Sequence, residues 1–239
     1  MKFVINADDC FGYDGVTEKI VSFLKEGLIS QTTAILTFAE TLNNNMKLFD
    51  KESLKDKVGL HVSLTRGHPV SKEMSQSKYA SSNWLLNYTL NKRSSFFFLP
   101  RSYKKAVEAE IEAQMILYKK LGFRSLHFDS HGNYHCYFSL YKLFIKLGKK
   151  HGFASIRLPF TDHSKNIVYR LIKKHITKNF KRNFKTVEFA TLTIDEALNY
   201  KGDKSIEIMV HPSPNSSDED EKIRNFRRLN SDLIMMGEL

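Results

Sequence analysis

Cysteine is scarce in this chain: Cys10 and Cys136 are the only two among 239 residues. Two cysteines are too few for the disulfide framework of a small secreted protein and are typical of a reducing compartment. Long apolar runs are missing as well, since no stretch approaches the roughly 18 apolar residues that cross a membrane. The first residues also lack the basic, apolar and small-residue pattern of a signal peptide. We therefore expect neither export nor membrane spanning, and a cytoplasmic location.

The remaining composition is that of an ordinary globular protein. Hydrophobic residues make up 41% of the chain and charged residues 26%, and 239 residues can bury a substantial core. We predict a single domain over residues 1–239. The net charge of +11 stands out, and it keeps a basic nucleic-acid-binding protein among the alternatives.

Strand and helix patterns alternate along the chain. Short apolar runs predict strands at 2–7, 32–38, 57–65, 125–130, 154–159 and 205–211. Helical periodicity predicts helices at 16–27, 40–51, 103–122, 137–152, 163–183 and from about 217. This alternation predicts an α/β protein whose parallel sheet is wrapped by helices.

One region interrupts the alternation. Residues 66–100 contain Gly67, Pro69, a Ser-rich stretch, Trp84 and the run "FFFLP". An insertion or loop of this length is usually functional or mobile. Its aromatic side chains could line a substrate groove, or they could plug the barrel or pack on a neighbouring helix.

Polar side chains stand at or near the carboxyl ends of the predicted strands. They are Asp8, Asp9, His61, Asp129, His131, Arg157 and His211. In parallel α/β barrels the active site is assembled at that face from several strands, so we expect these separate segments to converge. A carboxylate with two imidazoles can hold a divalent metal and leave positions open for water and substrate. A lone strand-end histidine or an Asp-Asp pair is often only structural, and the combination is what favours a metal hydrolase.

Four segments resemble, in order, the signatures of a known family. "NADDCFGYDGVTEKI", "GLHVSLTRGHPV", "HFDSHGNYH" and "MVHPS" are similar to those of the YdjC-like carbohydrate deacetylases, over residues 2 to about 213. The resemblance implies a distorted (β/α) barrel of parallel strands, similar to a TIM barrel. It also implies hydrolysis of the acetamido group of an N-acetylated sugar with one bound divalent cation, described as magnesium in this family.

The resemblance also assigns residues. The metal ligands it implies are Asp9, His61 and His131, with Asp8 as the base. By ligand preference the same set suits zinc, cobalt or nickel. The pattern differs at Cys10, which we interpret as a small buried apolar residue, and at Asn133, which cannot titrate although His135 is present. Ser213 replaces the usual glycine of the last segment, a change that matters only if the turn needs a positive φ.

A mechanism follows as a hypothesis. Asp8 accepts the proton of the attacking water, His211 protonates the departing amine, and Arg157 holds Asp8 by charge-assisted hydrogen bonds. His211 could instead be a structural cap. Two rival functions stay open: a metal-dependent hydrolase of another bond such as a phosphoester, and the basic nucleic-acid-binding protein. The sequence decides neither the acetylated substrate nor whether the chain forms a homodimer.

The stretch 165–185 is strongly basic. Its eight Lys or Arg residues are at 165, 170, 173, 174, 178, 181, 182 and 185, and no acidic residue lies between Asp162 and Glu188. A helical apolar stripe runs through the same stretch. The simpler interpretation of this stretch is a solvated basic helix face. The alternative is a weak contact with an anionic membrane surface, which would place a lipid-linked or phosphorylated amino sugar beside the active site.

Overall fold

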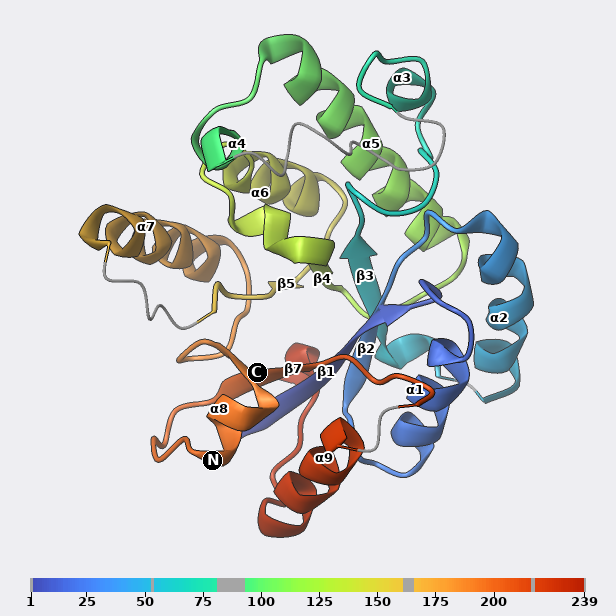
Figure 1. Ribbon diagram of the computed structural model, residues 1–239, viewed down its shortest axis with the longest axis vertical. Helices are drawn as coiled ribbons and strands as arrows, with labels where there is room; N and C mark the ends of the chain where they lie inside the picture. Colours follow the sequence, from blue (N-terminus) through green and yellow to red (C-terminus); the bar gives the residue numbers. More distant parts are fainter. Residues whose placement is uncertain (1, 53, 81–92, 161–165, 216–217, 239) are drawn as a thin grey trace.

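The centre of the protein is a sheet of parallel strands. The computed structural model describes residues 2–52, 54–80, 93–160, 166–215 and 218–238 (Figure 1). In these residues the strands are Phe3–Cys10 (β1), Gln31–Ala34 (β2), Val58–Val62 (β3), His127–Ser130 (β4), Ser155–Ile156 (β5), Thr191–Thr193 (β6) and Ile206–Val210 (β7). Their order is β5-β4-β3-β2-β1-β7-β6, and every pairing is parallel.

The two edge strands approach each other and nearly close the sheet. Phe160, just after β5, forms a single parallel bridge with Thr191 of β6. The Thr191 hydroxyl also donates to the Leu158 carbonyl, at 2.8 Å. A barrel joined at one seam by so few contacts is distorted, as the resemblance implied, and the predicted α/β fold is confirmed.

Helices surround the strands (Figure 1). The α-helices are Val16–Lys25 (α1), Ala39–Glu52 (α2), Lys72–Ser75 (α3), Arg93–Phe97 (α4), Arg101–Lys120 (α5), Tyr141–Lys150 (α6), Ile167–Asn183 (α7), Ile194–Leu198 (α8) and Asp218–Leu229 (α9). Short 3-10 helices are Lys55–Lys57 (η1), His131–Cys136 (η2) and Met236–Glu238 (η3). No helix within the described ranges combines the length and apolar character needed to cross a membrane. A cytoplasmic location stays a prediction.

Most predicted elements are present, with three differences. The strand expected at 32–38 ends at Ala34, and the one expected at 154–159 has two residues, Ser155 and Ile156. No sequence pattern predicts β6, because its three residues are too few for periodicity. The interruption at 66–100 contains α3 and α4, and Trp84 lies outside the described residues.

Strand alternation separates an apolar shell from a polar interior. Along β1, Phe3, Ile5 and Ala7 join the hydrophobic core, whereas Asn6 and Asp8 are buried on the opposite side. The buried polar side chains of the strands continue around the sheet as Gln31, Thr33, His61, His127, Asp129 and Glu207. A polar group inside a protein is costly unless hydrogen-bonded, so this interior must be satisfied from within.

Candidate metal centre

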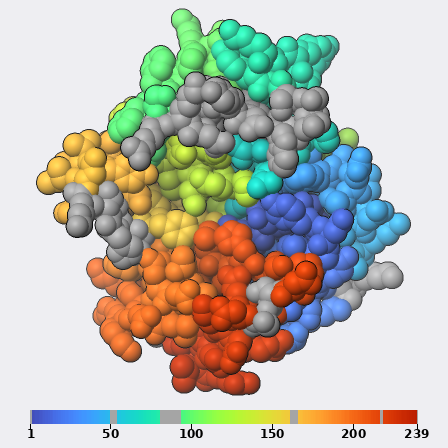
Figure 2. Space-filling view, in the orientation of Figure 1, coloured from blue at the N-terminus to red at the C-terminus, as the bar shows by residue number. Residues whose placement is uncertain are grey.

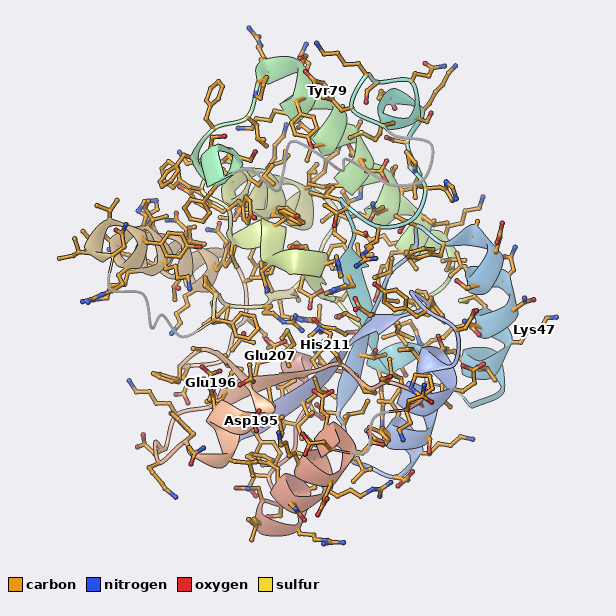
Figure 3. All side chains as sticks on the ribbon, in the orientation of Figure 1. Lys47, Tyr79, Asp195, Glu196, Glu207 and His211 are labelled. Carbon is orange, nitrogen blue, oxygen red and sulfur yellow. The ribbon has the colours of Figure 1, made fainter. Side chains whose placement is uncertain are left out.

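The strand-end residues converge at the carboxyl-terminal side of the sheet. The space-filling view shows N-terminal segments meeting C-terminal ones near the middle of one face (Figure 2). Glu207 and His211, both from the region of β7, lie near the centre of the molecule (Figure 3). Segments far apart in the sequence thus contribute to a single site, as predicted for a barrel.

The end of β1 turns two adjacent carboxylates toward the same place. A regular strand sends neighbouring side chains to opposite faces. The pairing of β1 with β2 shifts register between Ala7 and Cys10, and Asp9 adopts a left-handed backbone with φ 64°. Consequently Asp8 Oδ2 and Asp9 Oδ1 both face His61 Nε2, at 3.9 and 3.4 Å.

This turn is held by its surroundings. Phe11 also has a positive φ, 67°, which is uncommon for a bulky residue. Its ring is fully buried against Phe49 and Phe123, and its backbone N–H donates to Thr17 Oγ1 at 3.1 Å. The Gly12 N–H donates to the Asp9 carbonyl at 2.9 Å. Strained backbone of this kind persists only where packing determines it, and it is concentrated at functional sites.

Three side chains present metal-binding atoms to one another. Asp9 Oδ1 lies 3.4 Å from His61 Nε2 and 3.1 Å from His131 Nδ1. One ligand atom from each residue falls within 4.8 Å of the other two. One carboxylate and two imidazoles form a donor set of the kind found in catalytic metal centres, so these residues fit a divalent cation.

Asp129 fixes the orientation of His61. His61 Nδ1 donates to Asp129 Oδ1 at 2.5 Å, and Thr33 Oγ1 lies 3.2 Å from the same nitrogen. Because a carboxylate can only accept, the shared proton is on His61 Nδ1. The other ring nitrogen, Nε2, faces Asp9 and is available as a metal ligand. A carboxylate behind an imidazole is the usual support of a metal-binding histidine.

The surrounding acids favour a positive charge at this point. Burial lowers the pKa of His61, but the charges of Asp129 and Asp8 outweigh it and raise that pKa to about 10. Burial raises the pKa of Asp9, but hydrogen bonds to His131 and His61 outweigh it and hold that pKa below its usual range. A proton on His61 or a divalent cation can supply this charge, and metal binding displaces such protons.

Arg157 neutralises the inner part of the cluster. Its Nη1 and Nη2 donate to Asp8 at 2.7 and 2.6 Å, and Nη2 lies 2.8 Å from Asp129 Oδ2. Its Nε donates to Glu207 Oε1 at 2.9 Å. The guanidinium is completely buried, and burial lowers its pKa while the three carboxylates raise it well above the usual value. Arg157 therefore holds Asp8 in one orientation.

His211 stands at the edge of the site. Its Nε2 lies 3.9 Å from Asp8 Oδ2, and half of its side-chain surface is exposed, 50%. Its backbone N–H donates to Glu219 Oε1 at 3.1 Å. A ring that is open to solvent and within reach of a buried carboxylate can exchange protons with water and substrate.

Of the positions compared with the family pattern, Cys10 and His135 are buried and Asn133 is partly exposed. Cys10 is fully buried, and burial raises the pKa of its thiol to about 12, which suits the predicted small apolar role. His135 is also fully buried, with Nδ1 2.7 Å from Ser130 Oγ, and burial lowers its pKa to about 3. Asn133 adopts a left-handed backbone, φ 55°, inside η2. None of the three joins the ligand atoms of Asp9, His61 and His131.

Comparison with protein families gives a match along most of the chain. The model of the YdjC-like protein family matches residues 2–235. The chain belongs to the YdjC-like family. Its relatives include proteins named carbohydrate deacetylase from Brevibacillus brevis, 26% identical, and Oceanobacillus iheyensis, 28% identical. The matches cover 89% of this chain, and 82% and 85% of the relatives.

A solved structure shares the fold of this YdjC-like chain. It is the crystal structure of an Enterococcus faecalis protein proposed to cleave cellobiose phosphate, with a TM-score of 0.67 and 21% identity. The match covers 94% of both chains. At this identity the likeness shows the fold alone.

Two participants in the YdjC-like site were missed by the sequence reasoning. Glu207 is the second residue of β7 and accepts a hydrogen bond from Arg157, and Thr33 Oγ1 of β2 lies 3.3 Å from Asp129 Oδ2. A charged residue inside the apolar run "SIEIMV" was the available signal for Glu207. Thr33 gave none, because threonine is common in strands. Asp129 was recognised at a strand end, but its contact with His61 needs the register of β3 and β4.

Proposed function

We propose that this chain is a metal-dependent hydrolase that removes the acetyl group from an N-acetylated amino sugar. The observation that carries the proposal is the convergence of Asp9, His61 and His131 beside a carboxylate held by Arg157. The family and the names of the relatives supply the reaction class, carbohydrate deacetylation.

Asp9, His61 and His131 would hold the metal. A bound divalent cation would polarise the acetamide carbonyl and acidify water at the site. Two imidazole nitrogens and one carboxylate suit Zn²⁺ or a similar transition metal, whereas the family resemblance implies Mg²⁺. Measuring the activity of metal-free protein after addition of Zn²⁺ or of Mg²⁺ distinguishes these two possibilities.

Asp8 is the proposed base. Arg157 donates to both Asp8 oxygens, and Asn6 Nδ2 also donates to Oδ1 at 2.7 Å, so the lone pair that stays available is on Oδ2. The remaining lone pair of Oδ2 lies on the side of His61 and His211, where the attacking water would stand. Arg157 and Glu207 act through Asp8 by fixing its position, so they are positioning residues.

His211 is the proposed acid for the departing amine. Breaking the amide C–N bond leaves a nitrogen that must gain a proton, and a protonated imidazole can donate one. Its half-exposed position allows it to regain that proton from solvent. In this proposal Asp8 takes the proton of the attacking water and His211 supplies the proton of the leaving amine.

The rival hydrolysis of a phosphoester through two metals is disfavoured by Arg157. Asp8, His61 and Asp129 lie close enough together to suggest a second ion site. However, Arg157 Nη2 already contacts both Asp8 and Asp129, at 2.6 and 2.8 Å. The guanidinium takes the place that a second cation would need.

Acetate release tests the proposal. The substrates are N-acetylglucosamine in free, oligomeric, nucleotide-linked and lipid-linked form, each assayed with and without chelator. At least one should release acetate in a reaction that chelator stops and added metal restores. Asp9→Asn should lose this activity, while Asp195→Asn, an exposed residue paired with Lys222, should keep it. Failure of every acetylated sugar with metal-loaded protein would contradict the proposal.

A further inference from the structure

Exposed apolar side chains gather on one side of the molecule, where α4 and α7 lie (Figure 1). Ten large apolar residues are exposed in the described part of the chain, and six of them belong to this side. They are Phe97 and Phe98 at the end of α4, Phe138 before α6, and Ile167, Val168 and Leu171 on α7. Phe98 is 71% exposed and Ile167 64%, so these side chains meet solvent rather than the core.

Ring contacts join these segments into one surface. Phe96 of α4 packs against Tyr169 of α7, with ring centroids 4.8 Å apart, and against Tyr137 at 5.3 Å. Phe138 lies 6.5 Å from the ring of His175 on α7. We call this surface the α4/α7 face; it comprises the six exposed apolar residues and the basic residues of α7. Tyr137 also packs on Tyr134 of η2, at 4.9 Å, so the face adjoins the segment that contains His131.

Basic side chains share this face. Arg170, Lys173, Lys174, Lys178, Lys181 and Arg182 line one side of α7 and a groove of about 790 Å³. The opposite wall of the groove includes Phe160 and Phe189. Among the described residues, no carboxylate lies within 4.0 Å of Arg170, Lys174, Lys178 or Arg182, although Glu108, Glu112, Asp56 and Asp195 all pair with cations elsewhere. The positive charge of these four side chains is therefore left for an external partner.

The combination of exposed apolar and basic side chains on the α4/α7 face indicates what kind of partner it binds. Exposed aliphatic and aromatic side chains beside Lys and Arg are the features of surfaces that lie in the interface of an anionic membrane. A second copy of this face would bring like charges together. Three of the six exposed apolar residues, Ile167, Val168 and Leu171, are aliphatic, a type that enters the interface of a bilayer but does not stack on nucleic-acid bases as phenylalanine does. We propose that the α4/α7 face binds the surface of an anionic lipid bilayer. This binding is independent of the proposed deacetylation.

Co-sedimentation measures the binding directly. The full chain is mixed with vesicles of phosphatidylglycerol and phosphatidylcholine, or of phosphatidylcholine alone, at low and high salt. The protein should pellet with the anionic vesicles and much less with the neutral ones. High salt should weaken the binding without abolishing it, because salt screens the charges but leaves the apolar contact.

Matched variants locate the binding. Phe97→Ser with Phe98→Ser removes apolar surface, and Lys174→Glu with Lys178→Glu reverses two charges. Each pair should weaken the partition coefficient on the order of tenfold, because single basic residues each contribute measurably near an anionic surface and apolar groups add to them. The controls are Ile116→Ser with Leu229→Ser, and Lys47→Glu with Lys120→Glu, which are exposed residues outside the face. Lys47 projects from α2, on the other side of the molecule from α7 (Figure 3). Controls should change the partition coefficient by less than about twofold, as surface substitutions usually do.

Three results would overturn the proposal. One is equal, negligible pelleting with both kinds of vesicle at low salt. Another is equal weakening by the face variants and their controls, which would make the attraction a general effect of net charge. The third is a dimer in sedimentation velocity that Phe97→Ser with Phe98→Ser dissociates, since the face would then be an interface between copies.

Discussion

The barrel interior and α7 both concentrate charge, but they neutralise it differently. In the interior Arg157 is fully buried and contacts Asp8, Asp129 and Glu207. On α7, Arg170, Lys174 and Lys178 are exposed and have no described carboxylate nearby. Buried charge must be paired within the protein because water cannot solvate it, whereas exposed charge can await a partner. The buried charges around Arg157 therefore hold the site in one geometry, whereas the exposed charges of α7 are available to bind a partner.

Removing the central cation of the interior should produce the largest effect. Arg157→Met leaves three buried carboxylates without their shared partner and should lower the free energy of unfolding by about 3–5 kcal/mol. Urea denaturation measures it. Arg157→Lys keeps the charge but not the planar fork, so it should retain part of the stability. A loss below about 1 kcal/mol for Arg157→Met would show that the cluster does not depend on this residue.

The next effect concerns the rim of the same site. His211→Ala should lower kcat for deacetylation by about 10²- to 10⁴-fold, because a general acid is lost. The metal content and Tm should stay unchanged, since the side chain is half exposed and donates no ligand to the Asp9, His61 and His131 set. His151→Ala, on the far end of α6 and paired with Glu112, is the matched control. An unchanged rate for His211→Ala would remove it from the mechanism.

Some features of the site could be predicted from the sequence, and others could not. Asp8, Asp9, His61 and His131 could be predicted because parallel strands end at one face, and the structure brings their side chains together. The left-handed backbone of Asp9 could not be predicted, because it accompanies the register shift in the pairing of β1 with β2. Glu207 was missed because its partner Arg157 directly follows β5, which is at the far edge of the strand order from β7.

The α4/α7 face was also predictable only in part. The basic character of α7 could be read from residues 165–185, although Lys165 lies outside the described residues. Its apolar neighbours could not, because the contact between Phe96 and Tyr169 joins segments far apart in the sequence. Within the "FFFLP" run Phe96 packs on a neighbouring helix, α7, as one alternative expected, and Phe97 and Phe98 are exposed.

A buried neutral group should make the interior sensitive to acid. Burial lowers the pKa of His135 to about 3, against about 6.5 in the unfolded chain. The unfolded state binds a proton below about pH 6.5 and the folded state does not, so stability is complete above that pH and falls as the pH drops toward 3. Between pH 7 and pH 5 this group should cost about 2 kcal/mol. Urea denaturation of His135→Asn should show a smaller acid-induced loss than wild type; an identical loss would contradict the assignment.

An exposed ion pair should show the smallest effect. Arg124 and Asp56 form a salt bridge whose side chains are 66% and 56% exposed. Arg124→Ala should change the free energy of unfolding by less than about 1 kcal/mol, because water already solvates both groups. Comparison with Arg157→Met in the same urea series isolates the effect of burial on one residue type. A cost for Arg124→Ala similar to that of Arg157→Met would remove the distinction between buried and exposed charge.

The most direct test is a metal titration of activity. Metal-free protein is titrated with Zn²⁺, and separately with Mg²⁺, while acetate release from an N-acetylated chitooligosaccharide is followed. Activity should rise with one of the two ions and level off at about one ion per chain, since Asp9, His61 and His131 share one ion and Arg157 already binds the carboxylates of the neighbouring groups. His61→Ala with His131→Ala should neither bind that ion nor release acetate. Full acetate release by metal-free protein, or an unchanged titration in the double variant, would contradict the account.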